Sequence, residues 1–141
     1  MDKIKSFEIN HDAHQVGLYM SHQEHGIYTY DMRFKTPNGG DYISPKSLHT
    51  IEHILATLYR NSEYRDRVVY FGPMGCRTGF YLLMRDTDID EVLPLTIRIL
   101  TQAVKFDTIP GSTRVECGNY LEHDLSGAIE DIKKYLDVLT K

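Results

Sequence analysis

The clearest hydrophobic pattern in the chain lies at residues 27–34 (IYTYDMRF), where apolar and polar residues alternate. Alternation with a period of two places apolar residues on one side of a strand and polar residues on the other, as in a half-buried β-strand. The apolar side holds Tyr28, Tyr30, Met32 and Phe34, and the polar side holds Thr29, Asp31 and Arg33. The segment at residues 37–40 (PNGG) predicts a turn, since its glycines adopt backbone angles that other residues resist.

Helices and two more strands are predicted along the rest of the chain. Ser44 is a favoured N-cap and Pro45 is tolerated at the first helical position, so a helix is expected from there to about Asn61. Short apolar runs predict strands at 68–71 and 80–84, separated by a glycine-rich loop at 72–79. Further helices are predicted at 91–106, with Pro94 in the first turn or kinking the helix, and at 126–139.

This order of short strands and helices is typical of the α+β class. The expected architecture is an antiparallel sheet covered by helices on one face. No internal repeat, low-complexity tract or linker divides residues 1–141. A single domain is therefore expected.

The first predicted helix carries two separate stripes. Leu48, Ile51, Leu55 and Leu58 recur at helical spacing and are expected to face the core, while His49, Glu52, His53, Ala56 and Arg60 form the second stripe. Histidines four residues apart point the same way from a helix, so their imidazoles can bind one metal ion without distorting the backbone. Glu52 lies beside them in position for acid–base chemistry, and the small side chain of Ala56 leaves space for a ligand.

The order His-x-x-Glu-His at residues 49–53 is the inverted form of a zinc-peptidase motif. Its plain alternative is a solvated helix face, but the grouping of both histidines with a carboxylate, a small residue and an arginine favours a metal site. A catalytic metal needs a third protein ligand and keeps a fourth position open for water or substrate. Spacing leaves the third ligand open among Cys76, Cys117, a carboxylate and the histidines at 11, 14, 22, 25 and 123.

Composition and charge narrow the class of partner. The net charge of -4 and the scattered basic residues argue against nucleic acid or an anionic membrane, and favour a small polar ligand. The chain has no apolar run of the about 18 residues that a membrane span needs, and its start lacks the apolar core of a signal peptide. A cytoplasmic protein is therefore expected, in which the two cysteines are buried, catalytic or metal-bound rather than paired.

Five short blocks of the sequence resemble the LuxS family of S-ribosylhomocysteine lyases in order and roughly in spacing. They are SFEINH at residues 6–11, YDMRF at 30–34, SLHTIEHILA at 47–56, PMGCRTGF at 73–80 and ECGNY at 116–120. The resemblance implies metal ligation by His49, His53 and Cys117, acid–base catalysis by Cys76 and Glu52, and substrate contacts from Ser6, His11, Arg33 and Arg60. The histidines at 14, 22, 25 and 123 are expected to be structural or at the surface.

The resemblance also implies a homodimer with active sites between the subunits. The aromatic side of residues 27–34, expected to be exposed, would need such a cover. Two features depart from the family pattern. The stretch between His11 and Arg33 is shorter than usual. Tyr70 stands where relatives often carry an acidic residue, so the sequence does not identify the residue that binds the amino group of the substrate.

The same resemblance implies a reaction and a cofactor. LuxS enzymes cleave S-ribosylhomocysteine to homocysteine and 4,5-dihydroxy-2,3-pentanedione, the precursor of the quorum-sensing signal autoinducer-2. The thioether is unactivated, so the carbonyl must migrate from C1 to C3 before β-elimination, with a metal acting as Lewis acid. Iron(II) is expected in the cell, and zinc(II) or cobalt(II) suits the same ligands in a purified sample. Cys76, among loop N–H groups beside Arg77, suits proton transfer as a thiolate.

Two other functions fit the metal motif alone. One is a metallopeptidase of the inverted-motif type, in which Glu52 would activate a metal-bound water, but such enzymes usually have a longer chain and substrate cleft. The other is a non-catalytic metal-binding module, which would close all four metal positions with protein ligands. The sequence offers no tight Cys/His cluster of that second kind.

Overall fold

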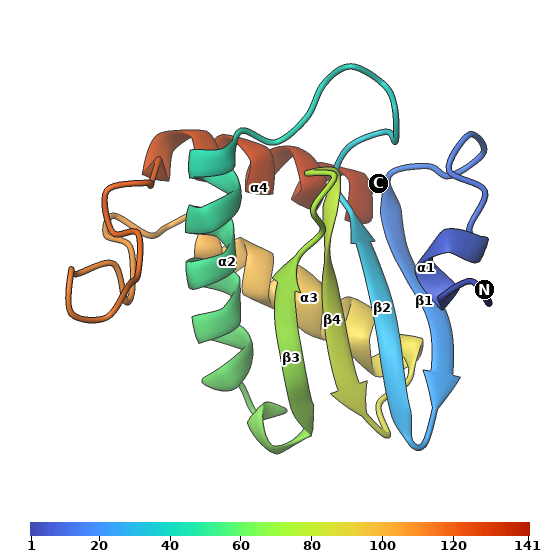
Figure 1. Cartoon of the computed structure of the whole chain (residues 1–141). Helices are drawn as coiled ribbons and strands as arrows, with labels where there is room; N and C mark the ends of the chain where they lie inside the picture. Colours follow the sequence, from blue (N-terminus) through green and yellow to red (C-terminus); the bar gives the residue numbers. More distant parts are fainter.

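The computed structural model describes residues 1–141 and is built on an antiparallel sheet of four strands (Figure 1). The strands are β1 (Gly17–Glu24), β2 (Ile27–Arg33), β3 (Val68–Pro73) and β4 (Gly79–Arg85), and they lie in the order β1-β2-β4-β3. β2 is therefore a central strand, paired with β1 on one edge and with β4 on the other. The three strands expected from the sequence are all present, each within about two residues of its expected ends.

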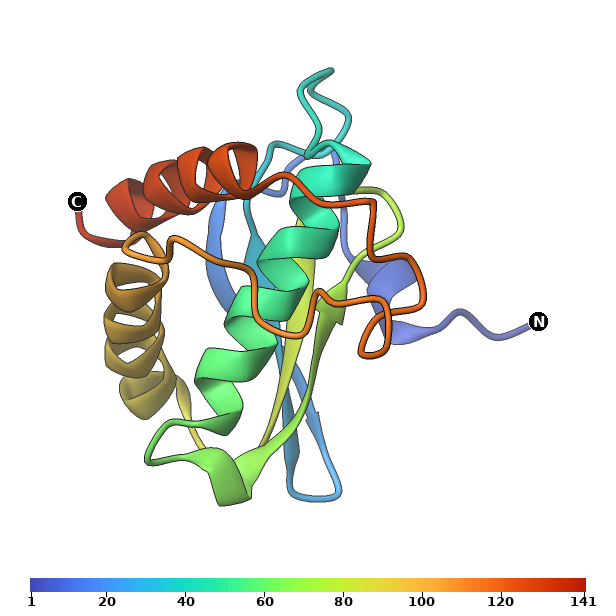
Figure 2. The same ribbon diagram turned by 90° about the vertical axis from the view of Figure 1, so that its left-hand side faces the viewer.

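Three long helices cover one face of the sheet: α2 (Pro45–Arg60), α3 (Ile89–Ala103) and α4 (Leu125–Leu139). Each of these helices is capped at its N-terminus by a side-chain oxygen, which accepts a hydrogen bond from the backbone N–H three residues later. The capping residues are Ser44, Asp88 and Asp124, respectively. Figure 2 shows the short helix α1 (Lys5–Glu8) on the opposite side of the sheet from α3 and α4. A 3-10 turn at Arg65–Arg67 precedes β3. The arrangement confirms the α+β class.

The hydrophobic core lies between the sheet and the three long helices. The apolar side of β2 faces it: Tyr30 and Met32 are fully buried, and Phe34 stacks on Tyr135 of α4 with ring centroids 4.1 Å apart. The expectation that this aromatic side is exposed and needs a partner subunit is therefore wrong, because helices of the same chain cover it. This side of β2 therefore gives no support for a dimer.

The polar side of β2 faces away from the core and is buried as well. Asp31 and Arg33 are 0% and 1% exposed, respectively. His14, between α1 and β1, places its ring Nε2 3.0 Å from a carboxylate oxygen of Asp31. A buried charge is tolerated where a partner of opposite charge and hydrogen bonds offset its lost hydration. The side of the sheet away from the long helices thus holds an ion pair beneath its surface.

Two elements, β1 and α1, are not predicted by the sequence pattern. β1 is an edge strand whose pairing with β2 shifts register between Met20 and His22, and such a bulge breaks the period of two on which strand prediction depends. α1 has four residues, too few for a helical pattern. α3 begins two residues earlier than expected because Asp88 caps it, and Pro94 falls inside the helix. No helix of the structure has both the length and the apolar character needed to cross a membrane.

Candidate metal centre and acid–base pocket

Helix α2 presents the two motif histidines on its side away from the core. The core side is formed by Ile51, Ile54, Leu55 and Tyr59, which are fully buried, with Leu48 and Leu58 at the margin. His49 and His53, one turn apart, are only partly buried, and their ring centroids are 4.7 Å apart. The two stripes predicted for this helix are therefore present, and the second meets another segment of the chain.

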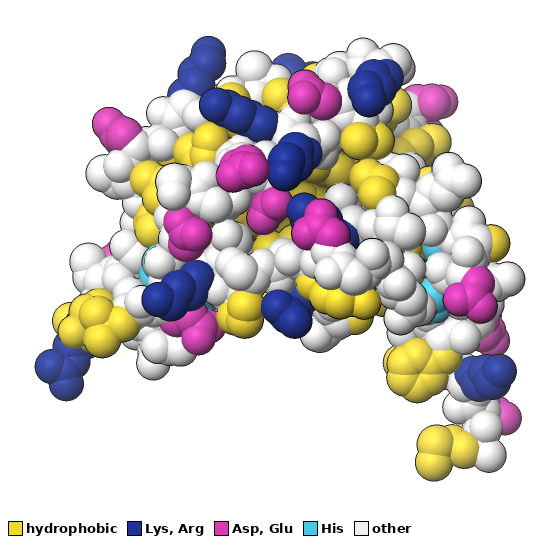
Figure 3. Space-filling view, turned by 90° about the horizontal axis from the view of Figure 1, so that it is seen from above, with side chains coloured by type: hydrophobic (Ala, Val, Ile, Leu, Met, Phe, Trp, Pro, Cys, Tyr) yellow, Lys and Arg dark blue, Asp and Glu magenta, His cyan; other side chains and the backbone are white.

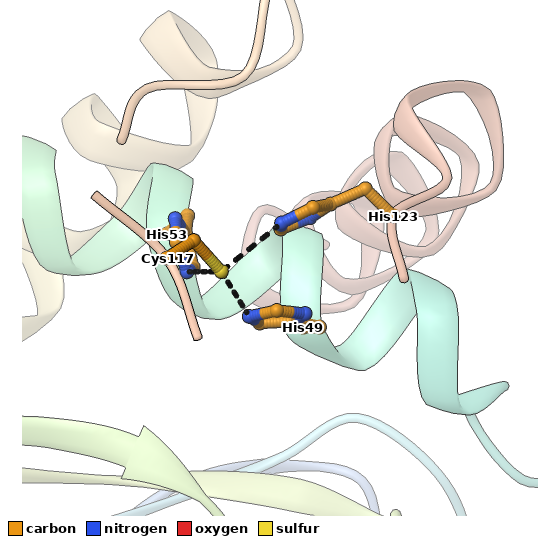
Figure 4. Close-up of side chains that lie close together, drawn as sticks. All are labelled: His49, His53, Cys117 and His123. Atoms are coloured by element: carbon orange, nitrogen blue, oxygen red, sulfur yellow. Dashed lines mark hydrogen bonds between the residues drawn. The ribbon is translucent and has the colours of Figure 1, made fainter. Parts of the chain in front are cut away.

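That segment is the connection between α3 and α4, residues 104–124, which we call the outer loop. It runs beside α2 (orange in Figures 1 and 2) and brings Cys117 and His123 to the two helix histidines (Figure 4). The Cys117 sulfur lies 3.4 Å from Nε2 of His49 and 3.9 Å from Nε2 of His53 and of His123. The four potential ligand atoms all lie within 4.8 Å of one another. We call these four residues the metal cluster.

The chemistry and spacing of this cluster fit a divalent metal ion. A tetrahedral ion binds imidazole nitrogen at about 2.0 Å and thiolate sulfur at about 2.3 Å, which sets neighbouring nitrogen and sulfur ligands about 3.5 Å apart. The sulfur–nitrogen distances from Cys117 to His49 and His53 are close to this value. Two imidazoles and a thiolate suit zinc, cobalt or ferrous iron. The cluster is therefore able to hold one such ion.

Backbone carbonyls of the outer loop fix the two helix histidines in the form that binds metal. Nδ1 of His49 donates to the carbonyl of Glu122 at 2.8 Å, and Nδ1 of His53 donates to that of Pro110 at 2.9 Å. A carbonyl only accepts, so each ring carries a proton on Nδ1 and leaves the Nε2 lone pair for the ion. The chain turns directly after Pro110 at Gly111, whose φ of +65° favours glycine.

His123 is one of the histidines that spacing left open as a third ligand and that were then expected to be structural or at the surface, yet the structure places it in the cluster. Its ring stacks on that of His49, with centroids 4.0 Å and planes 22° apart, and its Nδ1 lies 2.9 Å from the hydroxyl of Thr50. Burial lowers the pKa of His123, and the nearby His49 and His53 lower it further, which favours the neutral ring. His123 lies in an irregular loop six residues after Cys117, where no periodicity indicates side-chain direction. Only the folded course of the loop brings it into place.

A second group of candidate residues lines a separate pocket beside α1. Cys76 lies in the tight connection between β3 and β4, where the N–H of Arg77 donates to the carbonyl of Met74 at 3.0 Å. The pocket has a volume of about 350 Å³ and lies between this connection, α1 and β2. Its lining includes Ser6, Phe7, His11, Arg33, Cys76 and Tyr81. Four of the residues singled out in the sequence therefore lie together here.

A chain of hydrogen bonds runs from Cys76 into the sheet. The hydroxyl of Thr78 lies 3.0 Å from the Cys76 sulfur and accepts a hydrogen bond from Nη1 of Arg33 at 2.9 Å. Arg33 also donates through Nε and Nη2 to the two carboxylate oxygens of Asp31, at 3.1 and 2.6 Å. Thr78, Arg33 and Asp31 are buried, so these polar contacts are stronger than they would be in water. One hydroxyl thus separates the thiol from a fixed positive charge.

The other candidate residues lie outside this pocket in the single chain. Glu52 lies on α2, three residues after His49 and directly before His53. Arg60, the last residue of α2, is exposed and donates to the carbonyl of Val69 at 3.1 Å, so the structure brings it to neither group. Tyr70 is 50% exposed on β3, with its ring against the glycine at position 72. The metal cluster and the Cys76 pocket are therefore built from different segments.

The fold and this site define a class of protein: α+β proteins in which two histidines of one helix and a cysteine and a histidine of a loop form a cluster able to hold one metal ion. Comparison with known proteins narrows the class. The chain belongs to the S-ribosylhomocysteinase (LuxS) family, whose sequence profile matches residues 4–141. This confirms the resemblance noted in the sequence.

Several curated proteins are similar over nearly the whole chain. The S-ribosylhomocysteine lyase of Borreliella burgdorferi (strain ZS7) is 44% identical over 99% of this chain and 93% of its own length. The lyase of Desulfotalea psychrophila is 43% identical over 96% of this chain and 89% of its own length. The lyase of Clostridium beijerinckii is 40% identical over 97% of this chain and 91% of its own length.

Proposed function

We propose that this chain is an S-ribosylhomocysteine lyase, which forms homocysteine and 4,5-dihydroxy-2,3-pentanedione, the precursor of autoinducer-2. The observation that carries the proposal is the cluster of His49, His53 and Cys117 in a chain of the LuxS family. Relatives that match it over nearly their full length are named for this activity. No comparable observation favours a peptidase.

The chemistry of this reaction requires a carbonyl group to move along the ribose chain. The carbon–sulfur bond breaks readily only when a carbonyl stands two carbons from the sulfur, because removal of the intervening C–H proton then expels the thiolate. Each shift of the carbonyl by one carbon needs one C–H proton to be removed and another to be returned at the neighbouring carbon. A bound divalent ion would supply Lewis acidity toward the sugar oxygens on which negative charge builds.

Cys76 and Glu52 are the proposed proton carriers. The Thr78 hydroxyl accepts from Arg33, so its own single proton is directed at the Cys76 sulfur. A sulfur that accepts a hydrogen bond is stabilised as a thiolate, the form that removes a proton. Glu52 lies one residue from His53 on the same helix, where its carboxylate can take and return a proton of a substrate held at the cluster.

Ser6, His11 and Arg33 are the proposed substrate contacts within the Cys76 pocket. A guanidinium has five N–H donors, and Arg33 uses three of them on Asp31 and Thr78, which leaves two for a substrate oxygen. Arg60 is also a proposed contact, made from the surface of α2 rather than from the pocket. Its fork could clamp the carboxylate of the homocysteine end.

We also propose a homodimer in which each active site combines the Cys76 pocket of one protomer with the metal cluster of its partner. No residue of the cluster lines the pocket, and the outer loop and α1 lie at opposite sides of the molecule in Figure 1. Figure 3, seen from above, shows that the outer loop and the N-terminal segment both project from the face of the molecule that is toward the viewer in Figure 1. A hollow lies between the two projections. Exposed apolar side chains on both, Val115 and Leu121 on the loop and Phe7 at the pocket, support burial against a second copy.

Iron(II) is the proposed metal in the cell. Sites of this type bind zinc more tightly than iron, so zinc or cobalt is expected to replace iron in a purified sample unless iron is supplied without air.

The two unpaired cysteines support a cytoplasmic location, where thiols stay reduced. One core cluster that draws on all three long helices and the central strands supports a single domain over residues 1–141. The proposed reaction yields the precursor of a quorum-sensing signal and homocysteine, a compound of the methyl cycle.

The proposed activity is tested by thiol release. The iron(II) protein is kept anaerobic and incubated with S-ribosylhomocysteine, and the homocysteine formed is measured with a chromogenic thiol reagent beside cleavage of a generic peptide. A lyase releases thiol and leaves the peptide intact, a metallopeptidase does the reverse, and a metal-binding module does neither. Absence of thiol release from a fully metal-loaded sample would overturn the assignment.

A further inference from the structure

His123 is held in the metal cluster by a contact that differs from those of the two helix histidines. Carbonyls hold Nδ1 of His49 and of His53, whereas the hydroxyl of Thr50 holds Nδ1 of His123 at 2.9 Å. The same hydroxyl accepts a hydrogen bond from the backbone N–H of Asp124, also at 2.9 Å. Thr50 is fully buried on α2, so water does not supply it with another partner.

The direction of the hydrogen bond between Thr50 and His123 follows from counting protons. A hydroxyl has one proton to donate. In a helix that proton can go to the backbone carbonyl four residues earlier, as it does from Thr101 to Ile97, but Thr50 makes no such bond. Nδ1 of His123 is the remaining acceptor within reach. If the ring donated instead, the Thr50 proton would be buried without an acceptor, which is unfavourable. Nδ1 therefore accepts, and the neutral ring carries its proton on Nε2.

We propose that His123 is not a fourth metal ligand but a hydrogen-bond donor to the metal-bound sulfur of Cys117. Its Nε2 faces that sulfur at 3.9 Å, and a nitrogen that carries a proton has no lone pair to offer an ion. His49, His53 and Cys117 then bind the ion, and the fourth position stays open for substrate. The inference rests on the proposed function only in that the cluster holds a divalent ion.

The donor role gives His123 a chemical effect on the reaction. A hydrogen bond to a thiolate ligand withdraws electron density from the sulfur and so from the ion, as partners of metal ligands commonly do. A bound ion would then be a stronger Lewis acid toward the sugar oxygens. The stacking of His123 on His49 also holds the ring of one ligand in place. His123 is thus a positioning and tuning residue that touches a ligand rather than the substrate.

Nitrogen NMR of the zinc-loaded protein reads the ring protons directly. In ¹⁵N-labelled protein, His49 and His53 are expected to carry protons on Nδ1 with Nε2 bound to zinc. His123 is expected to show the opposite pattern, a proton on Nε2 and a bare Nδ1, with its signals assigned by their loss in His123→Gln. A zinc-bound Nε2 on His123 would overturn the proposal.

Cobalt(II) tests the contact with the sulfur. His123→Gln is expected to hold one cobalt ion per chain with affinity lowered about 10–100-fold, and to shift the sulfur-to-cobalt charge-transfer band. His25→Gln, in the exposed β1–β2 hairpin, is the matched control and should keep the parent spectrum, while His49→Gln should lose most of the metal. Metal loss in His123→Gln equal to that in His49→Gln indicates a fourth ligand. Retained cobalt with an unshifted band indicates no contact with the sulfur, and either result overturns the proposal.

Variants of Thr50 test the proton count without touching a histidine. Thr50→Ser keeps the hydroxyl and should keep the parent spectrum, whereas Thr50→Val, of similar shape, should shift the band as His123→Gln does. An unshifted band in a folded Thr50→Val protein would contradict the assigned direction. None of these readouts uses substrate. A protein that binds cobalt in this way but releases no thiol would therefore contradict the lyase function alone.

Discussion

The hydroxyl of Thr78 lies 3.0 Å from the sulfur of Cys76 and accepts a hydrogen bond from Arg33 on its other side. Because a hydroxyl has a single proton, that proton is left for the sulfur. Thr78 thus links the Cys76 sulfur to the Arg33 guanidinium through two hydrogen bonds, although the two groups do not touch each other. A loop thiol is in this way joined by hydrogen bonds to an ion pair buried in the sheet.

Replacing Thr78 by valine should slow thiol release about 10–100-fold, since a hydrogen bond to a charged group contributes about 1.5–3 kcal/mol. Thr78→Ser keeps the hydroxyl and should retain most of the rate. Both variants are compared by kcat in the thiol assay, with metal content checked by elemental analysis. Equal rates for Thr78→Val and the parent would show that the hydroxyl does not assist Cys76.

The two cysteines should respond differently to substitution by alanine. Cys117→Ala should lose metal and activity together and should unfold more easily, because metal binding to the native state contributes folding free energy. Cys76→Ala should keep its metal and lose on the order of 10²–10⁴-fold in rate, as expected for a proton carrier. Elemental analysis and turnover of each variant check this. Metal loss in Cys76→Ala with metal retained in Cys117→Ala would reverse the two roles.

Mixed dimers should reveal which protomer supplies each half of the site. When Cys76→Ala and Cys117→Ala chains are coexpressed with different tags, random pairing should restore about a quarter of the parent activity, since half the dimers then contain one complete site of two. The matched control coexpresses the parent chain with a chain that carries both substitutions, whose mixed dimers should be inactive. Activity in the control dimers, with none in the first pair, would place each complete site within one chain.

The buried ion pair between Asp31 and Arg33 should matter for stability. Arg33→Met leaves the Asp31 carboxylate buried without its main partner and should lower the free energy of unfolding by about 3–5 kcal/mol, measured by urea denaturation. The double variant Asp31→Leu/Arg33→Met removes both charges and should lose less than the two single losses added together. Strictly additive losses would show that the two side chains do not depend on each other.

Tyr70 offers a test of substrate recognition. A carboxylate at this exposed position of β3 can pair with the ammonium group of the homocysteine end, so Tyr70→Asp should lower KM about two- to fivefold, the range of an exposed ion pair. Tyr70→Asn lacks the charge and serves as the control. If kcat and KM are both unchanged in Tyr70→Asp, this position does not touch substrate and the amino group is held elsewhere.

The parts of this structure that could be predicted from sequence are those with a regular period. The stripe that carries His49 and His53 follows from helical spacing alone, and Ser44 and Pro45 mark the start of that helix. Cys117 and His123 lie in an irregular loop, where side-chain direction has no period. The family resemblance points to Cys117, whereas neither it nor any pattern points to His123.

The alternation in β2 predicts which residues share a side but not what covers each side. Asp31 and Arg33 have the spacing of solvent-facing residues, yet they are buried beneath the segment that carries His14. Burial of a polar side depends on a covering segment distant in sequence. The same limit explains why the aromatic side of β2 does not indicate a dimer interface, since α4 covers it.

The double pairing of β2 also determines where the length of the chain can vary. A slip of one residue would turn Asp31 and Arg33 into the apolar core, so a single insertion within β2 is forbidden in practice. The β1–β2 hairpin is different, because its two-residue turn at His25 and Gly26, both with positive φ, can close a shorter ladder in the same register when each strand loses the same number of residues. The short stretch between His11 and Arg33 is thus a region where the chain can differ in length while the walls of the Cys76 pocket keep their places.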